Sequence, residues 1–110
     1  MSEQQNTELV QNAYAAFKRG DITSVLNAMS DDVTWFLPGP EEIPVAGHRR
    51  GRDQVGQFFT TLAETQEAQE FEPKEFIAQG ETVVVLGHYK WRVKSTGRAF
   101  ESDFAHVFRV

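Results

Sequence analysis

The chain has 110 residues, of which 40% are apolar, and a formal net charge of −5. The length fits one domain, and the acidic balance disfavours nucleic-acid binding, which draws on a surplus of lysine and arginine. The absence of cysteine excludes disulfides, thiolate metal sites and a cysteine nucleophile, and it favours a cytoplasmic location. A polar start and the lack of a long apolar run predict neither a secretion signal nor contact with a membrane.

Three amphipathic helices are predicted in the first part of the chain. Apolar residues recur there at i, i+3, i+4 and i+7, which places them on one side of a helix. Gly20 ends the first helix, and Asp21 is a good N-cap for the second. The predicted helices cover residues 7–19, about 22–29 and about 52–64.

Strands are predicted between the second and third helices and throughout the rest of the chain. They are rich in β-branched and aromatic residues and are separated by turn residues. The predicted strands cover residues 33–37, 71–78, 82–94 and 98–110. A loop is expected from Pro38 to Gly51, and the arginines at 49, 50 and 52 are interpreted as its solvated end, countering Asp53.

Helices followed by a strand meander predict an α+β fold with the helices gathered on one face of the sheet. Consecutive strands joined by short turns form antiparallel hairpins, and long antiparallel strands curl. We therefore expect a single domain over residues 1–110, in which three helices pack on a curved antiparallel sheet and enclose a cone-shaped pocket.

Three segments carry a resemblance to a known family: NAYAAFKRGDITSVLNAMSDDVTWFLPGP, GHRRGRDQVGQFFTTL and FESDFAHVFRV. In this order they resemble the SnoaL-like polyketide cyclases and ketosteroid isomerase relatives of the nuclear transport factor 2-like superfamily. The resemblance covers nearly the whole chain and implies a cystatin-like α+β roll. It also implies one more strand after Val110, so we expect the native chain to continue by roughly ten to twenty residues.

The resemblance implies catalytic positions, which this sequence fills only in part. Tyr14 stands where an oxyanion-binding tyrosine is implied, but Leu37 stands where ketosteroid isomerases carry their base, and a leucine cannot abstract a proton. Steroid isomerisation by that mechanism is therefore not expected. Asp103 and His106 are the remaining acid–base candidates. Strand alternation places them on opposite faces, so only one of them is expected to face a ligand.

Four further residues are candidates for ligand contact: Trp35, Leu37, Phe58 and His88. Trp35 can offer a flat surface to a planar ligand or serve core packing, and His88 can be a hydrogen-bonded sheet histidine instead. The histidines are scattered without the short spacing of metal-binding pairs, so neither a metal nor another cofactor is predicted.

Two functions remain open at this point. One is a cofactor-independent isomerase, cyclase or lyase that acts by acid–base chemistry on a small apolar carbonyl compound, and the other is a non-catalytic ligand-binding or dimerisation module. A homodimer through the sheet is expected as well. It is inferred from aromatic and apolar residues that exceed the needs of one small core: Tyr89, Trp91, Val93, Phe104 and Phe108.

Overall fold

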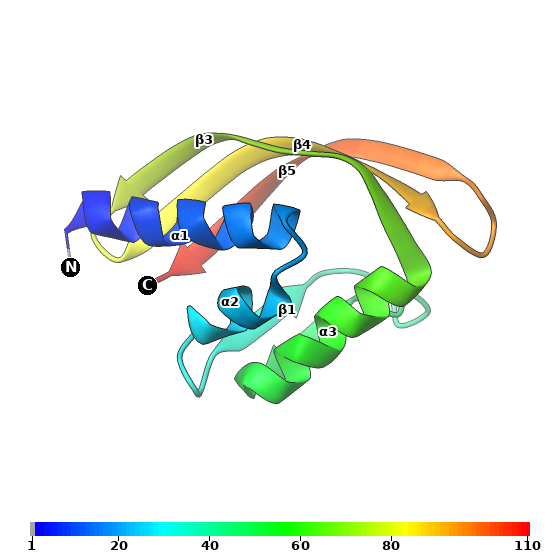
Figure 1. Ribbon diagram of the computed structural model, residues 1–110, viewed down its shortest axis with the longest axis horizontal. Coiled ribbons are helices and arrows are strands. Elements are labelled where there is room, and N and C mark those ends of the chain that lie inside the picture. The colour runs from blue at the N-terminus through cyan, green and yellow to red at the C-terminus, as the bar shows by residue number, and fades with distance from the viewer. Residues whose placement is uncertain (1) are drawn as a thin grey trace.

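A computed structural model describes residues 2–110 and has the predicted α+β architecture (Figure 1). Three helices lie below an arched sheet, with α1 running along the strands and α3 leading directly into β3. The helices are α1 (Glu3–Lys18), α2 (Ile22–Asn27) and α3 (Gly51–Thr65). The strands are β1 (Thr34–Leu37), β2 (Gly47–Arg50), β3 (Gln66–Gln79), β4 (Thr82–Val93) and β5 (Ala99–Arg109).

Helix α1 starts four residues earlier than its apolar pattern predicted, because a capping box extends it. The Ser2 side chain accepts a hydrogen bond from the backbone N–H of Gln5, and the Gln5 side chain accepts one from the backbone N–H of Ser2. The same end of the helix holds the β3–β4 turn, since Asn6 donates to the Gly80 carbonyl and Glu3 accepts from the Gly80 N–H. The polar start of the chain is therefore part of the fold.

The main sheet has the order β3-β4-β5 with antiparallel pairing throughout. Two register shifts interrupt β3, between Ala68 and Glu70 and between Pro73 and Glu75. Such bulges bend a strand, and the sheet in Figure 1 is strongly arched. Strand β3 also begins at Gln66, directly after α3, rather than at Phe71 as predicted.

The predicted single curved sheet is wrong in one respect, because β1 pairs only with β2 in a separate two-stranded sheet. Strand β2 lies inside the segment predicted as a loop, where Arg50 is exposed as expected but Arg49 is partly buried. Arg49 donates to the carbonyls of Pro44 and Val45 and lies 5.2 Å from the ring centre of Phe58. Arg52 forms a 2.8 Å ion pair with Asp31. Their part here is structural.

Two apolar clusters fill the interior. The first lies among α2, α3 and β1, and its buried members are Ala16, Val25, Val45, Val55, Phe58 and Phe59. The second lies between α1 and the main sheet, and its buried members are Val10, Tyr14, Val83, Val85 and Phe104. The described part of the chain contains no helix that is both long and apolar enough to cross a membrane.

The aromatic residues used to predict a dimer do not form an outer surface. Tyr89, Phe104 and Phe108 pack in the second cluster, and Trp91 is buried against Phe71. The cross-strand register explains this, because it places alternate residues of β4 opposite alternate residues of β5 on one face of the sheet. These four aromatic side chains are therefore used by the interior of one chain and do not exceed its needs.

Candidate functional site

A tyrosine and a histidine meet between α1 and the main sheet. The Tyr14 hydroxyl oxygen lies 2.6 Å from Nδ1 of His106, which is a short hydrogen bond between residues 92 positions apart. Helix α1 presents Tyr14 to the sheet on the same side as Val10, and His106 lies on the inner face of β5 opposite Val85. Four phenylalanine rings border the pair: Phe71, Phe76, Phe104 and Phe108.

This apolar setting keeps both groups uncharged. Burial lowers the pKa of His106 to about 4, so its imidazole is neutral near pH 7. Burial also raises the pKa of Tyr14 above its usual value, so its phenol keeps its proton. The pair therefore combines a neutral imidazole, which can accept a proton, with a protonated phenol, which can donate a hydrogen bond.

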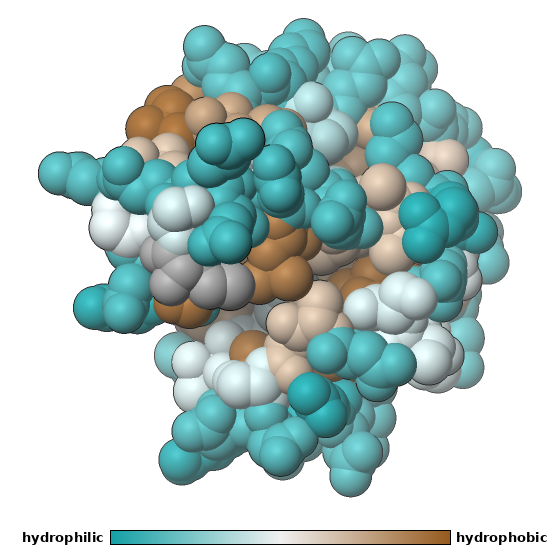
Figure 2. All heavy atoms as spheres, turned by 60° about the vertical axis from the view of Figure 1, so that its left-hand side comes forward, coloured by the Kyte–Doolittle hydropathy of each residue, from teal (hydrophilic) through white to brown (hydrophobic). Residues whose placement is uncertain are grey.

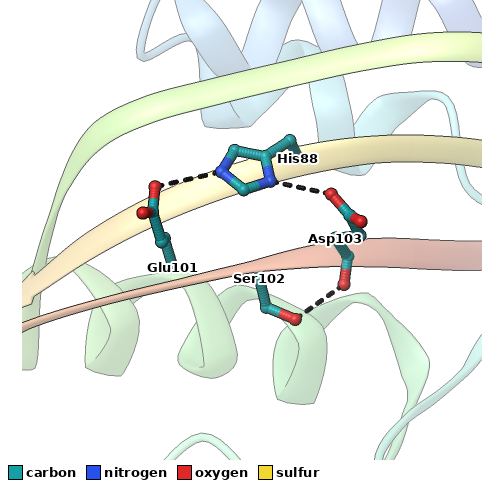
Figure 3. Close-up of polar contacts among 4 residues, drawn as sticks. All are labelled: His88, Glu101, Ser102 and Asp103. Carbon is teal, nitrogen blue, oxygen red and sulfur yellow. Dashed lines mark hydrogen bonds and ion pairs between the residues drawn. The ribbon is translucent and has the colours of Figure 1, made fainter.

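Asp103 lies on the opposite face of β5, as strand alternation requires. Its side chain is 92% exposed and accepts a 2.8 Å hydrogen bond from Nδ1 of His88, while Nε2 of His88 lies 3.1 Å from Glu101 (Figure 3). His88 and Asp103 are cross-strand neighbours on β4 and β5. The outer face thus holds a second polar cluster, and Asp103 and His106 cannot act on the same ligand atom.

The other predicted ligand contacts lie away from the tyrosine–histidine pair. Trp35 and Leu37 pack against the first cluster, in which Phe58 is buried. The Trp35 ring centre lies 5.3 Å from that of Phe58 and 5.7 Å from that of Phe59. In this arrangement the Trp35 ring packs against the helix α3 side chains.

A groove of about 470 Å³ opens between the helices and β3. Its apolar lining comes mainly from Phe17, Ile22, Phe59, Leu62, Phe71 and Trp91. Phe71 also lies beside Tyr14, with ring centres 5.9 Å apart, so one aromatic ring separates the groove from the tyrosine–histidine pair. A second hollow of about 530 Å³ lies between α3 and the ends of β4 and β5. Neither includes Tyr14 or His106 in its lining.

The side of the molecule that carries both chain ends is hollowed as well. Figure 2 brings this side forward and shows apolar residues gathered in a recess between hydrophilic margins. Strand β5 ends on this side of the molecule (Figure 1). His106, near that end, is only partly buried, whereas Tyr14 is 8% exposed. Solvent or a ligand can therefore approach the imidazole more readily than the phenol.

The sequence indicated Tyr14 and His106 as separate candidates, but it did not indicate that they touch. It singled out Tyr14 through the resemblance and His106 as a titratable residue near the end of the chain. It did not single out the residues that line the groove. The sequence pattern places Phe17 of α1 and Trp91 of β4 on the inner sides of their elements. This pattern indicates that a residue is buried, but it does not indicate that a cavity lies beside it.

The chain belongs to the SnoaL-like domain family, whose model matches residues 10–110. Its fold is that of the nuclear transport factor 2-like superfamily. A nuclear transport factor 2-like protein from Burkholderia xenovorans LB400 is 39% identical, with a TM-score of 0.89 over 100% of this chain and 82% of that one.

Two further relatives extend the comparison. The crystal structure of TerC co-crystallised with polyporic acid is 28% identical, with a TM-score of 0.81 over 96% of this chain and 81% of that one. An uncharacterized protein of Mycobacterium tuberculosis H37Rv is 26% identical over 100% of this chain and 82% of its own length.

Proposed function

We propose that this protein is a cofactor-independent acid–base enzyme that acts on a small, largely apolar carbonyl compound. The observation that carries the proposal is the 2.6 Å contact between the Tyr14 hydroxyl and Nδ1 of His106 inside an aromatic cluster. A neutral imidazole beside a protonated phenol is the pairing that enolisation of a carbonyl compound needs.

The chemistry follows from the tautomer that carries the imidazole proton on Nδ1. In it, His106 donates its Nδ1 hydrogen to the Tyr14 oxygen, which leaves the phenol hydrogen free to bind a carbonyl oxygen. The unprotonated Nε2 then accepts the proton from the carbon next to the carbonyl, and the phenol stabilises the resulting enolate oxygen. In a β,γ-unsaturated carbonyl compound, return of that proton to the γ carbon moves the double bond and isomerises the compound. Where the same compound carries a second carbonyl group, attack of the enolate carbon on it closes a ring, and the proton on Nε2 neutralises the alkoxide that forms.

The apolar surroundings support a ligand that is mostly hydrocarbon. Phenylalanine rings border the pair, and the groove on the other side of Phe71 is lined chiefly by apolar side chains. The co-crystallisation of TerC with polyporic acid supports an organic small molecule as the kind of ligand.

Hydrogen–deuterium exchange tests the acid–base step without knowledge of the natural substrate. Cyclohexanone, 1-indanone and 1-tetralone are incubated with the protein in D₂O, and the loss of the proton signal next to the carbonyl is followed by NMR. We expect the protein to accelerate exchange of at least one ketone. Replacing Tyr14 with Phe or His106 with Gln should slow that exchange by roughly 100-fold, the usual contribution of a general acid or base.

Two matched variants control for loss of a phenol or an imidazole elsewhere. Tyr89→Phe removes the other tyrosine hydroxyl, and His48→Gln removes an imidazole on β2. Both should exchange the ketone at the rate of the unaltered protein. Equal rates in all four variants, or no acceleration by the unaltered protein, would contradict the acid–base proposal.

A non-catalytic binding module is the second candidate, and the groove of about 470 Å³ favours it because neither Tyr14 nor His106 contributes to its lining. Trp91 lines this groove, so a Trp35→Phe variant has Trp91 as its single tryptophan. A bound aromatic compound such as 1-naphthol should then change the Trp91 emission. Ala63→Phe, which narrows the groove, should weaken this binding, whereas Tyr14→Phe should not.

A further inference from the structure

The outer face of the main sheet holds a cluster of metal-ligating side chains that the proposed enzyme site does not use. His88 is central to it. Three ligand atoms lie within 4.8 Å of one another, and they come from Glu70, His88 and Glu101. Asp103 accepts a hydrogen bond from the other nitrogen of the His88 ring (Figure 3). Three different strands therefore bring these residues together.

Each nitrogen of the His88 ring faces a carboxylate, and a neutral imidazole cannot donate a hydrogen bond to both. It has one N–H, and the Nδ1 hydrogen bond to Asp103 uses it, so the Nε2 lone pair then points at the Glu101 carboxylate 3.1 Å away. A positive species between Nε2 and Glu101 removes this repulsion. That species is either a proton on Nε2 or a metal ion.

From this geometry we propose that Glu70, His88 and Glu101 bind a divalent transition-metal ion, with zinc as the best fit, and that Asp103 orients the His88 ring. Imidazole nitrogen and carboxylate oxygen are ligand types that zinc accepts, and three protein ligands leave the fourth tetrahedral position for water. A carboxylate that accepts a hydrogen bond from the far nitrogen of a metal-bound histidine fixes both the tautomer and the direction of the ring. Asp103 has this relation to His88.

The spacing requires only side-chain rotation. Metal–ligand distances of about 2 Å put tetrahedral ligand atoms a little over 3 Å apart. The contact from His88 to Glu101 already has this length at 3.1 Å. Glu70 closes the remaining gap by rotating about its own bonds, because it is exposed at the bulge of the edge strand.

Zinc and a proton compete for Nε2 of His88, so binding should weaken as the pH falls. This follows because an imidazole nitrogen must be free of its proton to bind a metal ion. The charged groups that share the outer face around the ring come from all three strands: Glu70 and Glu72 from β3, Lys90 from β4, and Glu101 and Asp103 from β5.

Titration with zinc chloride by isothermal calorimetry tests the proposal on the intact chain, freed of metal by a chelator. We expect one ion per chain, with tighter binding at pH 7.5 than at pH 5.5. His88→Gln and Glu101→Gln should each weaken zinc binding at least about tenfold. Asp103→Asn should weaken it by about tenfold as well, as loss of an orienting partner does.

His48→Gln is the matched control, since it removes an imidazole on a different sheet and should leave zinc affinity unchanged. Imidazole NMR signals give an independent readout, in which zinc should shift the resonances of His88 and leave those of His48 and His106 in place. Absence of binding by the unaltered chain, or equal affinity in the His88→Gln variant, would overturn the proposal. These readouts do not depend on the Tyr14–His106 chemistry.

Discussion

At the residue scale, two histidines in β-strands face opposite sides of one sheet and acquire opposite properties. His106 lies among phenylalanine rings, and burial lowers its pKa to about 4. His88 lies between two carboxylates, and their hydrogen bonds raise its pKa above the usual value. The environment that each face of the sheet provides, rather than the residue type, sets the direction in which each imidazole pKa moves.

The low pKa of His106 predicts a loss of stability in acid. The unfolded chain binds a proton at the ordinary histidine pKa of 6.5, while the folded chain does so near pH 4, so the unfolded state holds more protons between these values. The free energy of unfolding should therefore fall by up to about 3 kcal/mol as the pH drops from 6.5 to 4. Urea denaturation at a series of pH values measures this.

His106→Gln should flatten that part of the stability profile, because its side chain does not titrate, whereas His48→Gln should preserve the slope.

His88 acts in the opposite sense: its raised pKa gives stability that is present below pH 6.5 and lost as the pH rises through the folded value. Proton NMR should show His106 titrating more than about 2 units below His88. Similar pKa values for the two histidines would contradict the burial argument.

At the scale of the elements, Gly87 explains how β4 passes beneath an aromatic ring. A Cβ atom at this position would lie 2.3 Å from the carbonyl oxygen of Glu72 and 2.4 Å from Cζ of Phe104. The Phe104 ring can therefore pack against bare backbone on the inner face of the sheet, where it also stacks on His106 with ring centres 4.2 Å apart.

Gly87→Ala should lower the free energy of unfolding by about 2 kcal/mol, because backbone and a packed ring must both move to accept the methyl group. Gly56→Ala, in the middle of α3, is the matched control. Its Cβ would lie 3.4 Å from Cδ1 of Leu26, and alanine favours a helix over glycine, so that change should be close to neutral. Thermal denaturation of both variants compares the two costs, and equal stability would show that β4 can move aside.

The helices could be predicted from the sequence, whereas one strand and the bulges of another could not. Helical periodicity predicted α1, α2 and α3 because it is a local pattern. Strand β2 was missed because its four residues, GHRR, have no apolar alternation and form a strand only through pairing with β1. The bulges of β3 were missed for the same reason, since register is a property of two strands.

At the scale of the whole molecule, the outer face of the main sheet carries an exposed apolar patch that consists of Ile77, Val84, Leu86 and Val107. Val107 is 71% and Ile77 is 52% exposed, and Val84 and Leu86 are partly exposed beside them. We propose that this patch, rather than the inward-facing aromatic residues, pairs two copies of the chain. A clustered apolar surface on a sheet is the kind of surface that an isologous two-fold interface buries.

Light scattering at micromolar concentration should therefore give the mass of a dimer. Val107→Glu should shift the protein toward the monomer, because it introduces a charge into the contact, whereas Thr60→Glu on the exposed side of α3 should not. A monomeric unaltered chain, or a Val107→Glu variant that stays dimeric, would contradict an interface through this patch.

The sequence by itself determined the α+β class, the helices, the three long strands and the opposite faces of Asp103 and His106, because each of these follows from local periodicity or strand alternation. Only the tertiary structure decided which of these residues meet. It places Tyr14 against His106 across 92 positions and gathers Glu70 and Glu101 around His88 from neighbouring strands. Contacts of this kind depend on how helices and strands pack against one another. The spacing of residues along the sequence does not give the distance between two side chains on different elements.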